Sequence, residues 1–203
     1  MDVTILWFKR DLRVADHPAL AVAAAGEGAV LPLYIVEPDY WALPDTSARQ
    51  WRFTAESLRD LGEALTGLGV PLQVAVGDAV QVLDALAERY RVVRLVSHEE
   101  TGNGWTYARD KAVAAWARGR GILWQECPQS GVVRRLKGRD GWSTARDGFM
   151  RQPVIEAPKA LRGQPGLVRG RSRMPAIWVC PSIPAPDGRK AAGPRGWPCW
   201  TAS

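Results

Sequence analysis

Short apolar runs that alternate with longer segments of helical period constrain the fold of this chain more than any other feature. Five runs have the length and composition of strands: residues 3–8, 30–36, 72–76, 92–96 and 122–125. The segments between them repeat apolar residues every three or four positions, as amphipathic helices do. Strands separated by helices form parallel sheets through right-handed crossovers. The sequence therefore predicts an α/β fold with a doubly wound sheet of five parallel strands.

Capping residues predict where several helices begin. Asp16 precedes Pro18 and is expected to cap the first helix. Ser47 and Gln50 have the spacing of a capping box at the start of the longest helix, and Asp78 is expected to cap the helix after the third strand.

Two further expectations concern the second strand and the last long helix. Pro32 lacks a backbone donor, so the first residues of the second strand are expected to lie outside the ladder. The helix after residue 104 is expected to carry its apolar side chains on one face, and these are Trp105, Ala108, Ala112, Ala115 and Trp116.

A ligand site is expected at the carboxyl ends of the strands, where doubly wound sheets bind their ligands. Three loops lie there: residues 9–13, 37–40 and 98–104. Neither the glycine pattern of a dinucleotide site nor that of a phosphate-binding loop follows any predicted strand. The sequence therefore disfavours a generic nucleotide enzyme.

The first strand and its loop carry a more specific pattern. Residues 7–20 read WFKRDLRVADHPAL, which resembles the opening signature of the DNA photolyase/cryptochrome family, with Lys9 for the usual arginine and His17 for the usual asparagine. Arg10, Asp11 and Arg13 alternate in charge, and arginine–carboxylate pairing is expected to lock this turn. Alanine at Arg10 or at Asp11 is therefore expected to destabilise the domain.

Residues 98–116 resemble the same family, whose members begin a helix with an R-D-x-x-V pattern after the fourth strand. The resemblance implies a pocket for a light-harvesting antenna pigment. Trp105 and Thr106 replace an asparagine–glutamate pair that binds folate in some members, so a deazaflavin is favoured over folate, with another pigment or an empty pocket as open alternatives. The residues expected at this antenna pocket are Lys9, Arg10, Asp11, Glu99, Glu100 and Arg109.

The resemblance implies a Rossmann-like photolyase N-terminal domain over residues 1–128 and an interdomain connector over residues 129–161. Residues 162–203 are rich in Gly, Pro, Arg and Trp, and their apolar residues repeat with neither the period of a helix nor that of a strand. This composition predicts a disordered or aberrant tail. Translation out of frame is one hypothesis for this tail. The helical domain that binds FAD in the family has no counterpart here, so no FAD and no catalytic residue are expected in this chain.

Composition and residue spacing also bear on metal binding, on the charge of a partner and on the cellular location. Cys127, Cys180 and Cys199 show no metal-ligand spacing, and His17 and His98 lie far apart in the sequence, so no metal site is predicted. The formal net charge of +6 suits a polyanionic partner without proving one. No segment is apolar enough for a signal peptide or a membrane span, and a cytoplasmic protein is expected.

Three functions stay open. The resemblance favours the N-terminal domain of a deoxyribodipyrimidine photolyase-like protein, which would repair pyrimidine dimers in damaged DNA when joined to the helical flavin domain. The alternatives are a cryptochrome-like blue-light signalling module without repair activity and an unrelated α/β nucleotide-binding protein.

Overall fold

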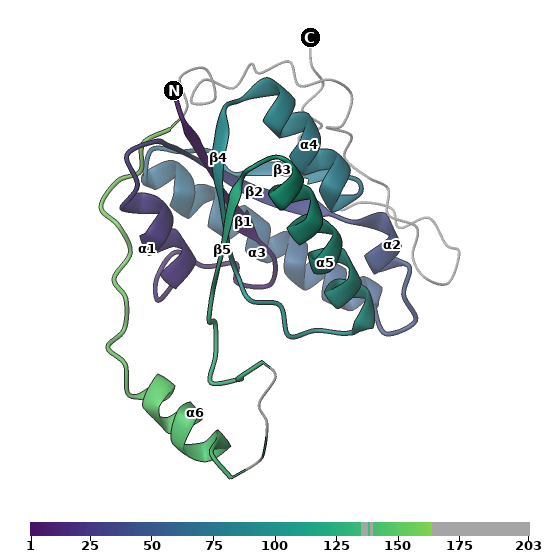
Figure 1. Cartoon of the computed structure of the whole chain (residues 1–203), viewed down its shortest axis with the longest axis vertical. Helices are drawn as coiled ribbons and strands as arrows, with labels where there is room; N and C mark the ends of the chain where they lie inside the picture. The colour runs from purple at the N-terminus through teal and green to yellow at the C-terminus, as the bar shows by residue number, and fades with distance from the viewer. Residues whose placement is uncertain (135–137, 139, 164–203) are drawn as a thin grey trace.

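Figure 1 shows the computed structural model, which describes residues 1–134, 138 and 140–163. One sheet lies at its centre, with the spatial strand order β3-β2-β1-β4-β5, and every pairing is parallel. The α/β fold with a doubly wound parallel sheet is therefore confirmed. The strands are β1 (Val3–Phe8), β2 (Ala29–Val36), β3 (Gln73–Val76), β4 (Val92–His98) and β5 (Leu123–Cys127).

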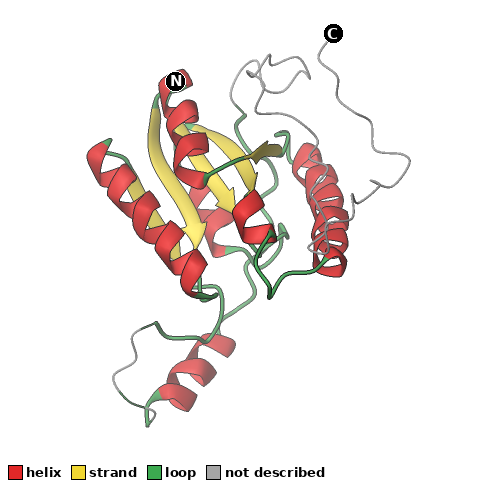
Figure 2. Ribbon diagram, turned by 90° about the vertical axis from the view of Figure 1, so that its right-hand side faces the viewer, coloured by secondary structure: helices red, strands yellow, loops and turns green. Residues whose placement is uncertain are grey.

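Helices cover both faces of the sheet, as the turned view in Figure 2 shows. Apolar side chains of α1 and α3 pack on one face, and those of α4 and α5 pack on the other. Because β1 is covered on both sides, all six of its residues are buried. The helices are α1 (Pro18–Ala24), α2 (Pro38–Trp41), α3 (Ala48–Gly67), α4 (Ala79–Arg89), α5 (Gly104–Gly119) and α6 (Trp142–Met150).

Two of the three expected helix caps are confirmed, and one is wrong. The Ser47 hydroxyl accepts from the Gln50 amide at the start of α3, and the Asp78 side chain caps α4. At α1 the cap is His17, one residue later than expected, and its ring Nδ1 accepts from the backbone amide of Leu20 at 2.8 Å. Asp16 instead adopts a positive φ of 49° in the preceding turn.

Pro32 lies inside the ladder, contrary to the expectation, opposite Leu6 of β1. The amide of Val30 points to the other side of β2 and donates to the Arg162 carbonyl at 2.7 Å. Amides two residues apart on a strand point the same way, so the nitrogen of Pro32 also faces that side. There β3 pairs with β2 only from Leu33 onward, so no ladder bond is lost at the proline.

The buried face of α5 also differs from the expectation. The buried residues are Thr106, Asp110, Val113 and Ala117, whereas the alanines at 108, 112 and 115 are exposed. Alanine is found in buried and in exposed positions of helices, so the spacing of the alanines predicted the wrong face of α5 as the buried one. The side that faces the molecule carries a polar residue, Asp110, whose charge is paired inside the protein.

The connector after β5 leaves the body of the protein and returns to it. None of the residues of α6 is buried, and Figure 1 shows this helix standing apart from the sheet. The chain comes back at Leu161, which is buried in the core beside α3, and Gly163 forms a bridge with Val30. Residues 164–203, which hold nearly all of the expected tail, lie outside the described residues.

Helix α3 is the longest of the described helices at 20 residues, and charged side chains recur along it. Neither this helix nor any other in the described part of the chain has the length and apolar character needed to cross a membrane.

Candidate functional site

The strand order places a topological switch point between β1 and β4. From β1 the chain moves outward through β2 to β3, and it then returns to the other side of β1 to form β4 and β5. Ligand sites of open α/β sheets lie at such a point, beyond the carboxyl ends of the two strands. Here the loop after Phe8 and the loop after His98 meet the start of α5.

A buried ion network joins these loops to α5. The Lys9 ammonium nitrogen lies 2.9 Å from an Asp110 carboxylate oxygen. The Arg109 guanidinium contacts Glu37 at 2.8 Å, Asp110 at 2.9 Å and Glu100 at 3.3 Å. Burial lowers the pKa of Lys9, and the Asp110 charge partly opposes this shift. Charges this deeply buried are stable only when they are paired, so the network fixes the three segments relative to one another.

Glu37 is the member of this network with unused hydrogen-bonding capacity. It is 6% exposed, and burial raises its pKa to about 7 although Arg109 opposes that shift. One carboxylate oxygen contacts Arg109, whereas the other, Oε1, has no hydrogen-bond partner among the described residues. A buried polar atom without a partner is costly and indicates a missing donor or acceptor.

Aromatic rings lie beside the same network. The Arg109 guanidinium carbon lies 4.9 Å from the centre of the Trp7 ring and 5.9 Å from that of Trp105. The Trp105 ring lies 5.6 Å from that of Tyr40, whose hydroxyl is 3.5 Å from Arg10. The site therefore combines charged groups with the faces of aromatic rings, a composition that suits a planar ligand with polar edges.

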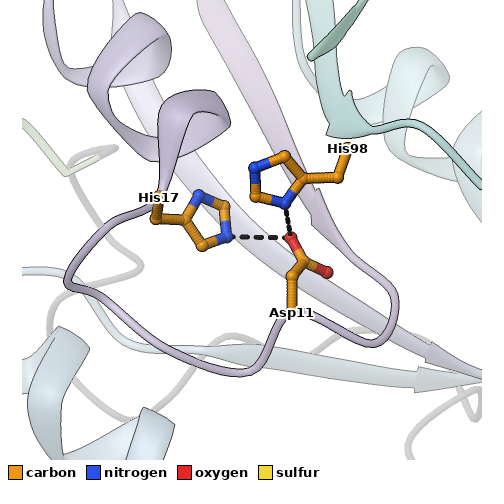
Figure 3. Close-up of side chains that lie close together, drawn as sticks. All are labelled: Asp11, His17 and His98. Atoms are coloured by element: carbon orange, nitrogen blue, oxygen red, sulfur yellow. Dashed lines mark hydrogen bonds and ion pairs between the residues drawn. The ribbon is translucent and has the colours of Figure 1, made fainter. Parts of the chain in front are cut away.

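Asp11 forms a second buried cluster, drawn in Figure 3 with His17 and His98. One of its oxygens accepts from the Lys9 amide at 2.8 Å, and the other accepts from His98 Nδ1 at 2.5 Å. His17 Nε2 lies 2.8 Å from that second oxygen but approaches it too obliquely for a regular hydrogen bond. Burial opposes the ionisation of Asp11, yet the two histidines outweigh it and hold the pKa of Asp11 below its usual range.

The expected arginine lock of this turn is therefore wrong, because Asp11 pairs with two histidines and with no arginine of the described residues. Arg10 is half exposed and reaches Glu100 at 3.6 Å instead. Arg13 donates to the backbone carbonyls of Ala15 and Asp16. The turn is locked as expected, but through ring nitrogens that reach it from α1 and β4.

The three side chains in Figure 3 are close enough to raise the question of a metal ion, since their ligating atoms lie within 4.8 Å of one another. Separation in the sequence is thus no argument against a shared site for His17 and His98. The tautomer of His17 gives a better argument against a metal ion bound by this ring. Its Nδ1 accepts from Leu20, so the neutral ring carries its proton on Nε2, the atom that faces Asp11. A protonated nitrogen cannot bind a metal, so in this tautomer the ring offers Asp11 a donor and no metal ligand, and the absence of a metal site stays a prediction.

Of the residues expected at the pocket, Lys9, Arg10, Glu100 and Arg109 come together, and Asp11 adjoins them through the Lys9 amide. Glu99 does not join them, because it points toward β5 and pairs with Arg134 at 2.9 Å. The structure adds four residues to this set, namely Glu37, Asp110, His17 and His98. Glu37 and His98 lie in two of the three loops expected at the site, and His17 precedes the proline of α1, so their positions could have indicated them.

Comparison with known proteins agrees with this architecture. The DNA photolyase family model matches residues 4–138. A cryptochrome DASH of Solanum lycopersicum is 35% identical over 105 residues, 49% of this chain and 18% of that protein. A cryptochrome DASH of Oryza sativa is 27% identical over 215 residues, 96% of this chain and 35% of that protein.

Among solved structures, a class III photolyase from Agrobacterium tumefaciens matches with a TM-score of 0.70 at 25% identity, over 81% of this chain and 36% of that one. This chain thus spans about a fifth to a third of the length of the relatives it matches. The family match removes the unrelated nucleotide-binding protein from the alternatives. The family model covers well over half of the sequence and the fold agrees with it, so this chain belongs to the DNA photolyase family.

Proposed function

We propose that this chain is the antenna-side domain of a photolyase-like protein and that the carboxyl ends of β1, β2 and β4 hold a light-harvesting pigment. The observation that carries the proposal is Glu37, a buried carboxyl group with one oxygen left without a partner. It lies at the end of β2, paired with the Arg109 side chain that also stacks near Trp7 and Trp105.

The chemistry of these groups fits a deazaflavin or flavin ring. Such a ring has an edge with an N–H donor and carbonyl acceptors, and its faces are apolar. Glu37 Oε1 could accept from the N–H group, Arg10 on the exposed side could donate to a carbonyl, and Tyr40 and Trp105 could contact a ring face. A folate pigment is disfavoured, because Trp105 and Thr106 stand where some relatives have a folate-binding pair.

An absorption spectrum of the purified full chain gives the first test, since a bound pigment absorbs in the near-ultraviolet or blue. Fluorescence titration with an 8-hydroxy-5-deazaflavin, FMN and methenyltetrahydrofolate would then rank the affinities of the three pigments for the chain. We expect the deazaflavin to bind most tightly and Arg10→Ala to weaken its binding several-fold.

Arg118→Ala is the matched control for this titration. Arg118 is an exposed arginine in the last turn of α5, nine residues after Arg109 in the sequence. It should leave binding unchanged. Absence of binding by all three pigments, or equal weakening by both arginine variants, would contradict a pigment site at these residues.

Repair of pyrimidine dimers in damaged DNA is proposed for this domain only when it is joined to a helical flavin domain of the family, on which repair depends. Signalling without repair is the second candidate, favoured by the cryptochrome names of the two plant relatives. Dimer splitting under blue light, assayed with the full chain and ultraviolet-treated DNA, should be absent. The cytoplasmic location stays a prediction, since those relatives are named as chloroplast or mitochondrial proteins.

A further inference from the structure

The cap of α1 is a titratable ring, whereas most helix caps are hydroxyl, amide or carboxylate side chains. The His17 side chain is fully buried, and each of its ring nitrogens faces a polar group. Nδ1 accepts from the Leu20 amide at 2.8 Å, and Nε2 lies 2.8 Å from an Asp11 oxygen. The ring therefore joins the first turn of α1 to the loop formed by residues 9–16.

A second proton on this ring would have to bind Nδ1, the atom that accepts from Leu20. Two N–H groups would then face each other across 2.8 Å, and the capping hydrogen bond would be lost. The new positive charge would also lie at the amino end of a helix, where the helix dipole is unfavourable to cations. Protonation of His17 and capping of α1 are thus mutually exclusive.

We propose that His17 is an acid-sensitive cap, whose protonation uncaps α1. The charged or titratable groups that act on the ring are Asp11 and Arg13 on the loop of residues 9–16 and His98 on β4. Asp11 favours the protonated ring, whereas burial, the largest influence, disfavours it together with His98 and Arg13. The pKa of His17 is accordingly lowered from its ordinary value of 6.5.

The sign of the effect follows from this shift. The unfolded chain takes up a proton on His17 near pH 6.5, before the folded chain does. The stabilising contribution of the neutral ring is present above pH 6.5 and is lost as the pH falls from there through the folded pKa. In that window the unfolding equilibrium constant should rise by roughly tenfold per pH unit through this residue alone.

His17→Asn is the matched variant, because the asparagine amide oxygen is a good cap acceptor and does not titrate. Amide hydrogen exchange of Leu20 in the full chain, corrected for the intrinsic pH dependence of exchange, should show a protection factor that falls at least tenfold from pH 7 to pH 5 in the unmodified protein. In His17→Asn it should stay constant. Other groups that titrate in this range, Glu37 among them, are common to both proteins and cancel in the comparison.

An equal fall of protection in both proteins, or a constant value in the unmodified one, would overturn the proposal. If His17→Asn does not fold, nitrogen chemical shifts of the His17 ring in the unmodified protein decide the question. At pH 7.5 we expect the tautomer with its proton on Nε2, and the opposite tautomer would refute the cap. None of these measurements uses a pigment, so their failure and that of the pigment proposal are distinguishable.

Discussion

Lys9 and Asp110 lie 101 residues apart in the sequence, yet the Lys9 ammonium nitrogen lies 2.9 Å from an Asp110 oxygen inside the protein. We expect Lys9→Met to lower the free energy of unfolding by about 2–3 kcal/mol. This loss is smaller than is usual when one partner of a buried ion pair is removed, because Asp110 keeps its contact with Arg109. Lys9→Arg retains the charge and should lose clearly less. Urea unfolding measures both, and equal losses would show that the charge at this position is immaterial.

Arg10 and Asp11 are neighbours in the sequence but differ in burial, with side-chain exposures of 52% and 1%. Asp11→Ala leaves the Lys9 amide and the His98 ring without their acceptor, so we expect a loss of about 3–5 kcal/mol. Arg10→Ala removes a half-exposed side chain whose partner Glu100 keeps its contact with Arg109, so it should cost less than about 1 kcal/mol. The sequence alone predicted that both would destabilise the domain more than a typical surface change does. Thermal unfolding of the two variants measures both losses, and we expect the lower melting temperature for Asp11→Ala. Similar melting temperatures would disprove the difference in stability expected between the two variants.

Glu37 should make stability depend on pH in the opposite sense to His17. Burial raises its pKa to about 7 in the folded protein from an ordinary value of 4.5, so the folded state binds the extra proton between those values. Its contribution is fully present below pH 4.5 and is lost as the pH rises through 7. Glu37→Gln keeps a carbonyl acceptor for Arg109 but cannot ionise.

The melting temperature of Glu37→Gln, relative to that of the unmodified protein, should therefore increase from pH 5 to pH 8. The expected difference in unfolding free energy across this range is about 1–3 kcal/mol, from the size of the shift. Glu63→Gln, at an exposed position of α3, serves as the control for the loss of a carboxylate outside the site. A constant difference between Glu37→Gln and the unmodified protein would mean that Glu37 titrates normally.

Gly102 is expected to tolerate no side chain. A Cβ atom there would lie 2.6 Å from the Arg10 guanidinium, 2.7 Å from the Thr106 hydroxyl and 2.9 Å from a Glu100 oxygen. Arg10 can move away, but Thr106 is buried and Glu100 is tied to Arg109. Gly102→Ala should thus be destabilising by about 1–3 kcal/mol.

Gly104 provides the matched control, because a Cβ atom there has no heavy atom within 4 Å. It is the first residue of α5, where alanine restricts the unfolded chain at no steric cost, so Gly104→Ala should be neutral or stabilising by up to about 1 kcal/mol. Denaturant midpoints of the two variants test the pair. Equal stability of both would show that the loop before α5 yields easily.

The elements of this fold were predictable because their signals are local. The capping contact between Ser47 and Gln50 lies within four residues, and the leucines of α3 repeat on one face of a single helix. The face of α5 was not predictable in the same way, since alanines are compatible with burial and with exposure. What decides it is the charge of Asp110, whose partner Lys9 lies in another part of the chain.

The candidate site was predictable to the level of its loops but not of its pairings. The strand order that brings β4 beside β1 joins the loops after both strands, and the switch-point rule indicated that edge of the sheet. The partners of Asp11 could not be found from neighbouring charges. Arginines flank it in the sequence, but the backbone turns them outward and places two imidazoles from α1 and β4 around the carboxylate.

The position of β1 in the centre of the sheet also has a consequence for synthesis on the ribosome. Val3 lies opposite Ala29 on one side and opposite Val92 on the other, so one edge of β1 can pair early and the second only after β4 has emerged. At about 5–20 residues per second, that edge stays open for roughly 5–20 s. During this time a strand with five apolar residues of six presents unpaired backbone groups to other chains, a hazard that a nascent-chain chaperone would reduce.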